Sequence, residues 1–297
     1  MPCYKPLIAY RSSNGSVNFV QNRFHGSGDT LSLPCGRCIG CRLEKSREWA
    51  MRCMHEAQMH ERNCFVSLTY NDFNLPEDGS LRYKDFQDFM RKLRYEFGKV
   101  RFYMCGEYGD DNGRPHFHAL LFGVDFDDKV YFKKSPAGFP LYRSRKLEVL
   151  WPYGYSSIGS LTFESAGYVA RYVMKKVTGD AAEAHYRVVN EDTGEVKERK
   201  PEFGHMSLKP GIGAAWLDKF SSDVYPGGRV VVRGAEGMSP RYYDLRWKKS
   251  HPDVMEQLAF ERDRAARLRY LDNTDERLAV KEKVRLAGIQ MLKRKLT

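Results

Sequence analysis

Residues 100–122 read VRFYMCGEYGDDNGRPHFHALLF, and this stretch decides the fold. Two runs of apolar, β-branched and aromatic residues, 100–107 and 116–122, predict two strands. Between them, Asp-Asp-Asn-Gly indicates a tight turn, because Asn and Gly readily adopt the backbone angles that hairpin turns need. The stretch is therefore predicted to be an antiparallel β-hairpin.

The segments around this hairpin mix strands and helices without the regular alternation of a doubly wound sheet. Residues 64–70 predict a buried strand, and residues 83–97 predict an amphipathic helix because apolar side chains recur at three- and four-residue spacing. Further elements are expected as helices at 42–62 and 162–177, a hairpin tip at 190–195, a strand at 230–232, and two helical pieces from residue 252 that separate near Asn273.

This pattern indicates an α+β fold with a central antiparallel β-sheet flanked by helices. The expected domain organisation has three parts: a Cys-rich amino-terminal segment at 1–45, the sheet domain at 46–230, and a mainly helical, basic carboxyl-terminal region at 231–297.

Composition limits the classes of function. The chain has 297 residues, 42% hydrophobic and 13% aromatic, which excludes wholesale disorder. No apolar run approaches the roughly 18 residues of a membrane span, and the first residues lack a secretion signal, so a soluble protein in the cytoplasm is expected. Lys and Arg number 49 against 38 Asp and Glu, a net charge of +11. Such a surplus favours nucleic acid as partner, although a basic protein without one is the alternative.

His116 and His118 are two residues apart on a predicted strand, so both imidazoles leave the same face. The hairpin brings the end of the preceding strand, Glu107, beside His116. Two imidazole nitrogens and a carboxylate oxygen with open positions suit Mg²⁺ or Mn²⁺ and a phosphate. The alternative is a pair of strand residues on a solvated face.

Tyr168 and Tyr172 lie one helical turn apart, so their phenols share a face. A phenol becomes a useful nucleophile when a metal ion or cation stabilises the phenolate. Lys175 or Lys176 would offset charge that develops on a phosphate. The alternative is that both tyrosines are structural residues of a helix–sheet contact.

Cys35, Cys38 and Cys41 have the spacing of thiolate ligands on a tight loop. Cys3 would complete a four-cysteine zinc site, and His25 is a competing fourth ligand. Four protein ligands leave no open position, so such a zinc ion would be structural. The alternative is free thiols in a turn. The remaining cysteines fall within helix or strand patterns and are expected in the core, namely Cys53, Cys64 and Cys105.

The motif Pro115–Phe122 (PHFHALLF) followed by Tyr168-x-x-x-Tyr172 resembles the HUH endonucleases that initiate rolling-circle replication. Residues 65–70 (FVSLTY) look like the first of that superfamily's three motifs. Residues 35–47 and 206–213 are similar to the replication initiators of gokushoviruses, small phages with circular single-stranded DNA.

This resemblance implies His116 and His118 as metal ligands and Tyr168 and Tyr172 as alternating nucleophiles. Glu107 lies where related initiators often have a third, acidic ligand, although that ligand varies within the superfamily. Arg171 stands where larger microvirus relatives have a lysine. Since arginine does not share a proton readily, Lys175 is the better candidate for acid–base work.

The implied protein is a metal-dependent, site-specific single-stranded DNA endonuclease and strand transferase. It would nick viral DNA at the origin through a 5′-phosphotyrosine and rejoin it, in the cytoplasm of a bacterial host. The chain has no Gly-x-x-x-x-Gly-Lys-Ser/Thr phosphate loop, so a host helicase and the host replication machinery are expected partners. Alternatives are a plasmid initiator or transposase with the same chemistry, and a non-catalytic single-stranded nucleic-acid-binding module.

Overall fold

The computed structural model describes residues 3–12, 14, 16–19, 30–110, 112–171, 176–177, 179–189, 194–232 and 234–291. These residues form two compact units. One unit contains the described residues of Met1–Lys45 and Glu256–Leu292, and the other is built on Ser46–Met255. Residues 231–255 thus group with the sheet-bearing unit, whereas the sequence-based division assigns them to the carboxyl-terminal region; that three-part division stays a prediction.

A seven-stranded, entirely antiparallel sheet dominates the second unit, as the α+β prediction requires. The strand order is β12-β5-β6-β4-β9-β8-β7. The predicted hairpin is confirmed as the adjacent strands β5 and β6, joined by a turn in which Gly113 has a φ of 60°. The strands are β4 Asn63–Tyr70, β5 Arg101–Tyr108, β6 Pro115–Phe122, β7 Val130–Lys134, β8 Pro140–Arg143, β9 Gly154–Gly159 and β12 Phe203–Met206.

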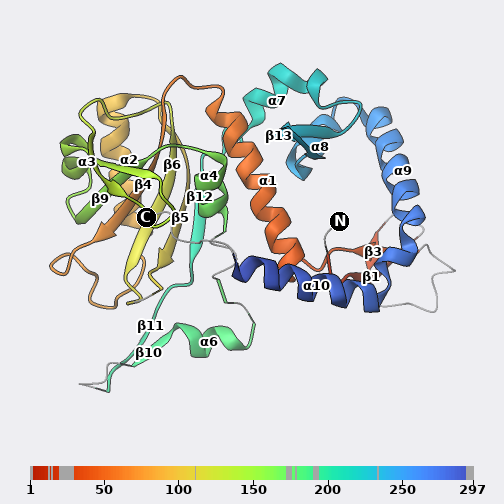
Figure 1. Cartoon of the computed structure of the whole chain (residues 1–297), viewed down its shortest axis with the longest axis horizontal. Coiled ribbons are helices and arrows are strands. Elements are labelled where there is room, and N and C mark those ends of the chain that lie inside the picture. Colours follow the sequence, from red (N-terminus) through yellow and green to blue (C-terminus); the bar gives the residue numbers. More distant parts are fainter. Residues whose placement is uncertain are drawn as a thin grey trace. The chain divides into compact units, whose positions relative to one another are not determined.

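One face of this sheet packs against helices α2 (Tyr83–Phe97) and α3 (Arg145–Leu150) (Figure 1). Helix α2 has the bounds predicted from its periodicity. Its apolar stripe is fully buried against the sheet, through Phe86, Phe89, Met90 and Leu93. Burial of each such side chain contributes about 1.5–3 kcal/mol, so this face supplies a large share of the stability.

The other face packs against helix α4 (Phe163–Ala170) and the second half of helix α1 (Ile39–Ala57). Cys53 and Cys105 are buried there and Cys64 on the opposite face, which confirms these three cysteines as core residues. Helix α1 ends five residues before the predicted end. The Asn63 amide donates hydrogen bonds to the carbonyl oxygens of Ala57 and His60, which satisfies acceptors that the last turn leaves open.

Helix α4 is also shorter than the predicted helix over 162–177. Thr162 caps its first turn reciprocally with Ser165. At the other end the Arg171 amide contacts the carbonyl oxygens of both Gly167 and Tyr168, the tightened geometry of a final helical turn. Residues 172–175, including Tyr172 and Lys175, lie outside the described residues.

Smaller elements complete the sheet-bearing unit. Two short strands flank the predicted hairpin tip, of which residues 190–193 lie outside the described part, and the predicted strand at 230–232 is present as β13. These elements are α6 Ala181–Tyr186, β10 Arg187–Val189, β11 Val196–Glu198, α7 Ala214–Phe220, the 3₁₀ turn η1 Ser221–Asp223, β13 Arg229–Val232, β14 Ala235–Met238 and α8 Arg241–Trp247.

The first unit combines a small antiparallel sheet of order β2-β1-β3 with helices from the end of the chain. The predicted break near Asn273 is confirmed, because the 3₁₀ turn η2 separates two helices there. None of the helices among the described residues is long and apolar enough to span a membrane. The elements are β1 Leu7–Arg11, β2 Val17–Asn18, β3 Thr30–Leu33, α9 Pro252–Leu268, η2 Tyr270–Asn273 and α10 Asp275–Gln290.

Candidate functional site

The β5–β6 hairpin places three ligand-type side chains on one face of the sheet. Glu107 pairs with His116, and His118 follows two residues later on the same side. The Glu107 Oε1 atom lies 3.2 Å from His116 Nε2 and 3.3 Å from His118 Nε2. The structure thus brings together the three residues that the sequence singled out as a metal site.

The outer nitrogens of both imidazoles are held by the surrounding backbone and side chains. His116 Nδ1 lies 3.0 Å from the carbonyl oxygen of Arg114, and His118 Nδ1 lies 2.7 Å from the Ser67 hydroxyl. A carbonyl oxygen only accepts, so His116 Nδ1 carries its hydrogen and, in the neutral ring, Nε2 presents a lone pair.

That lone pair faces a carboxylate oxygen, and the two repel unless a cation lies between them. The cation is either a second proton on the ring or a metal ion. Two imidazole nitrogens and one carboxylate oxygen, with Nδ1 anchored by a hydrogen bond, are a donor set that a divalent cation fits.

Glu107 supplies the negative charge of this cluster. The residue is only 2% exposed, and burial by itself raises the pKa of a carboxyl group. With protons on the two Nε2 atoms, the hydrogen bonds and positive charge of His116 and His118 outweigh that penalty and hold the pKa of Glu107 well below its ordinary value. The carboxyl group is therefore ionised at neutral pH.

Tyr168 reaches the same cluster from helix α4. Its hydroxyl donates a hydrogen bond of 3.2 Å to Glu107 Oε1, and its ring centroid lies 5.0 Å from that of His118. Burial, followed by the negative charge of Glu107, raises the pKa of the Tyr168 phenol. The phenol is thus protonated beside a bare carboxylate, and a cation at the site would favour its ionised form.

The other residues predicted for catalysis are not all described. Arg171 is described, and its guanidinium carbon lies 6.0 Å from the centroid of the Tyr168 ring. Tyr172 and Lys175 lie outside the described residues, so their roles stay predictions. Two contributors were missed from the sequence, Ser67 and the Arg114 carbonyl. Ser67 meets His118 only through the β4–β6 pairing, a contact between segments 51 residues apart.

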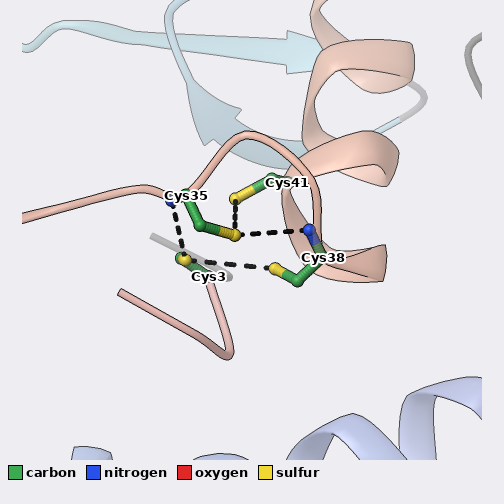
Figure 2. Close-up of side chains that lie close together, drawn as sticks. All are labelled: Cys3, Cys35, Cys38 and Cys41. Carbon is green, nitrogen blue, oxygen red and sulfur yellow. Dashed lines mark hydrogen bonds between the residues drawn. The ribbon is translucent and has the colours of Figure 1, made fainter. Parts of the chain in front are cut away.

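A second cluster gathers the four cysteines predicted to bind zinc (Figure 2). The sulfur atoms of Cys35 and Cys41 are 4.0 Å apart, and those of Cys3 and Cys38 are 3.9 Å apart. A tetrahedral ion with zinc–sulfur bonds of about 2.3 Å separates its ligands by about 3.8 Å. The four thiols therefore have the spacing of a closed zinc site.

Backbone amides point at three of these sulfur atoms. The amides of Tyr4, Cys35 and Cys38 each donate to a cysteine sulfur at 3.3 Å. Burial raises the pKa of the Cys38 thiol, but hydrogen bonds from the backbone amides outweigh it and lower that pKa to about 6. The surroundings of Cys38 thus favour the thiolate, the form that binds zinc, whereas burial raises the pKa of Cys3 and of Cys41. His25, the competing ligand, lies outside the described residues.

Fold and candidate site together define an α+β protein whose antiparallel sheet carries a histidine–carboxylate cluster beside a tyrosine. The sequence model of the family "Replication-associated protein ORF2/G2P" matches residues 63–177, which run from β4 through α4. The chain belongs to this family of replication-associated proteins, as the resemblance of its motifs indicated.

Relatives extend the likeness beyond those motifs. The chain is 32% identical over 264 residues to the replication-associated protein VP4 of Bdellovibrio phage phiMH2K. The aligned region covers 85% of this chain and 79% of VP4. The chain is 37% identical over 227 residues to the replication-associated protein ORF4 of Chlamydia phage 1, covering 72% of this chain and 53% of that protein. No solved structure matches the chain.

Proposed function

We propose that this chain initiates rolling-circle replication of a small phage by nicking and rejoining single-stranded DNA. One observation carries the proposal: the Tyr168 hydroxyl lies 3.2 Å from the same Glu107 oxygen that contacts both imidazoles. A potential nucleophile and a potential cation site therefore share one atom. A binding module has no need for this juxtaposition.

Glu107, His116 and His118 would hold Mg²⁺ or Mn²⁺. When bound, such an ion polarises the scissile phosphate and neutralises charge in the transition state. The protein fixes the donors for it: Ser67 and the Arg114 carbonyl orient the two rings, and the sheet register holds the carboxylate opposite them. The site is thus arranged before substrate arrives.

Tyr168 or Tyr172 would supply the attacking oxygen in the first step, and Tyr168 is the one that contacts Glu107. The hydroxyl oxygen of the attacking tyrosine bonds to phosphorus, and the bond from phosphorus to the 3′-oxygen breaks. The phenol gives up its proton to solvent water, and the leaving 3′-oxygen takes one up to become the hydroxyl that primes synthesis. The DNA 5′-end stays linked to that tyrosine as a phosphotyrosine.

Tyr172 is proposed as the other of the two alternating nucleophiles, and Lys175 as the cation that offsets charge on the phosphate. After one round, the free tyrosine attacks the regenerated origin while the other still holds the first strand. The released 3′-hydroxyl then rejoins that strand. In this proposal residues 46–230 form the endonuclease domain, a host helicase unwinds the duplex, and the reaction takes place in the cytoplasm of the host bacterium.

The proposal is tested with the full chain, Mn²⁺ and labelled single-stranded oligonucleotides that tile a phage origin region. We expect a covalent protein–DNA product that depends on the metal. Tyr168→Phe and Tyr172→Phe should each leave partial nicking, the double variant should leave none, and His116→Ala should abolish it. Tyr95→Phe is the control, because Tyr95 is 95% exposed on helix α2, which packs on the opposite face.

Two results would contradict the proposal. The first is full activity in the double tyrosine variant, which would remove both nucleophiles. The second is metal-independent binding of the oligonucleotides by wild-type protein with no covalent product on any of them, which would favour a non-catalytic binding module.

A further inference from the structure

The candidate site continues across the sheet onto strands that its chemistry does not use. Antiparallel pairing aligns four residues in one row on neighbouring strands: Glu107, His116, Thr69 and Tyr155. The adjacent row on the same face contains His118, Ser67 and Ser157. Neighbouring strands lie about 4.8 Å apart, so the Tyr155 backbone is about 10 Å from that of His116.

Tyr155 is an exposed aromatic residue on an interior strand. At Tyr155 strand β9 pairs with β4, whereas its pairing with β8 is at Ile158. On the far face of β9, Ser156 and Ile158 are buried, whereas the Tyr155 side chain is 67% exposed. The sheet is thus covered on one face here and open on the other.

Small hydroxyl side chains form the floor between Tyr155 and the histidine–carboxylate cluster. Thr69 and Ser157 are partly exposed, and Ser67 is buried beside His118. Helix α4 packs on β5 and β6, on the other side of the cluster. A polar strip therefore leads away from the candidate site and ends at an aromatic ring.

Arg143 follows the Tyr142–Ile158 pair at the end of β8. Its guanidinium lies 2.7 Å from Glu148 of helix α3, and that helix packs on the opposite face of the sheet. The strip from Thr69 to Tyr155 is therefore polar rather than charged.

We propose that Tyr155 is a base-stacking residue for the single-stranded DNA that occupies this face next to the site. An exposed ring and a hydroxyl-lined floor are elements with which sheets bind unpaired nucleic acid. The net charge of +11 favours a polyanion over an apolar protein segment. This inference rests on the proposed function, because it identifies how that substrate is held close to the scissile phosphate.

The test measures binding without cleavage, so that its result is independent of the nuclease reaction. Full-length protein is titrated, with no added divalent ion, into a fluorescent oligonucleotide that carries 2-aminopurine at successive positions. Loss of a stacking contact should raise the Kd of Tyr155→Leu about tenfold, and the quenching of one 2-aminopurine position should disappear. Tyr155→Trp should restore both, since any aromatic ring supplies a stacking face.

The matched control is Tyr95→Leu, which removes a still more exposed ring from helix α2. It should leave the Kd unchanged. The dependence of the Kd on salt should be the same in wild type and Tyr155→Leu, because no charge is removed.

The proposal is overturned if Tyr155→Leu binds within twofold of wild type, if Tyr95→Leu weakens binding equally, or if wild-type protein binds no single-stranded DNA. Normal nicking by wild type with unaltered binding in Tyr155→Leu would overturn the stacking role alone. A tenfold loss of binding in Tyr155→Leu together with an absence of nicking in wild type would support the stacking role and remove the nuclease.

Discussion

His55 is a buried imidazole that lies outside the candidate site. Its Nδ1 atom is 2.9 Å from the Tyr243 hydroxyl, and its ring is stacked on Trp216 at a centroid distance of 3.6 Å. Burial lowers the pKa of His55 to about 4, because the charged ring would lose its hydration. The protein therefore folds around the neutral form of this residue.

A pH dependence of stability follows from this shift. The unfolded chain binds a proton at His55 near pH 6.5, whereas the folded protein does so only near pH 4. Stability is therefore complete above about pH 6.5 and falls by up to about 3 kcal/mol as the pH drops toward 4. Urea unfolding at several pH values measures the free energy of unfolding as a function of pH. This free energy should fall less steeply with decreasing pH in His55→Gln than in wild type.

His185→Gln is the control for this measurement, since His185 is exposed on helix α6. If the free energy of unfolding depends on pH identically in wild type and His55→Gln between pH 4.5 and 7, His55 is not the titrating group.

At the scale of elements, a buried ion pair ties the end of helix α1 to strand β5. Arg101 Nε donates to Glu56 Oε1, and Arg101 Nη2 donates to the Pro210 carbonyl at 2.7 Å. The Gly213 amide donates to the second oxygen of Glu56 at 2.7 Å. The pair thus connects three segments that are far apart in the sequence.

Breaking this pair should destabilise the protein strongly. Arg101→Met leaves the Glu56 carboxylate buried without its cation, so we expect the free energy of unfolding to fall by about 3–5 kcal/mol. The double variant Arg101→Met/Glu56→Gln should lose less free energy of unfolding than the two single variants lose together. Chemical denaturation of the three variants measures both quantities.

The exposed pair of Arg246 and Asp218, at 2.7 Å, is the comparison. Arg246→Met should change the free energy of unfolding by no more than about 1 kcal/mol, because solvent screens this pair. An equal loss at both positions would contradict the role assigned to burial.

Local sequence patterns predicted those elements whose side chains alternate or recur clearly. Helix α2 and the β5–β6 hairpin show this best, because apolar spacing and turn residues are properties of one segment. Strand β9 was missed, since Gly-Tyr-Ser-Ser-Ile-Gly has little intrinsic preference for strand. Its place depends on close approach to β4: a Cβ at Gly154 would lie 2.3 Å from the Asn71 nitrogen.

The same distinction applies to the candidate site. Glu107, His116 and His118 could be grouped from the sequence because one hairpin carries all three. The approach of Tyr168 depends on how helix α4 packs on the sheet, and spacing along the chain does not determine that packing. Cys3 likewise contacts Cys35 across a separation of 32 residues. It could be assigned to the zinc site from the sequence only because three closely spaced cysteines leave a fourth ligand to be found.

At the scale of the whole molecule, the cysteine cluster bears on the stability of the first unit. The sheet of that unit is small, with strands of two to five residues, several of them exposed. Small units of this kind commonly depend on a metal or a disulfide to stay folded. We therefore expect zinc at Cys3, Cys35, Cys38 and Cys41 to stabilise this unit.

Elemental analysis should find about one zinc ion per chain and almost none in Cys38→Ser, because three thiolates no longer close the site. Limited proteolysis of Cys38→Ser should cut residues 3–45 faster than in wild type. Cys64→Ala is the control, as this cysteine is buried away from the cluster. If wild-type protein with reduced cysteines contains no zinc, the prediction is wrong.

Because Glu107 and His116 face each other across one turn, their alignment depends on the register of a single hairpin. The type and length of that turn fix the register, and a slip by one residue would send Glu107 to the opposite face of the sheet. The segment from Arg101 to Phe122 therefore carries all three ligand-type side chains, whereas the orientation of the His118 ring also requires a hydroxyl at Ser67 on the neighbouring strand β4.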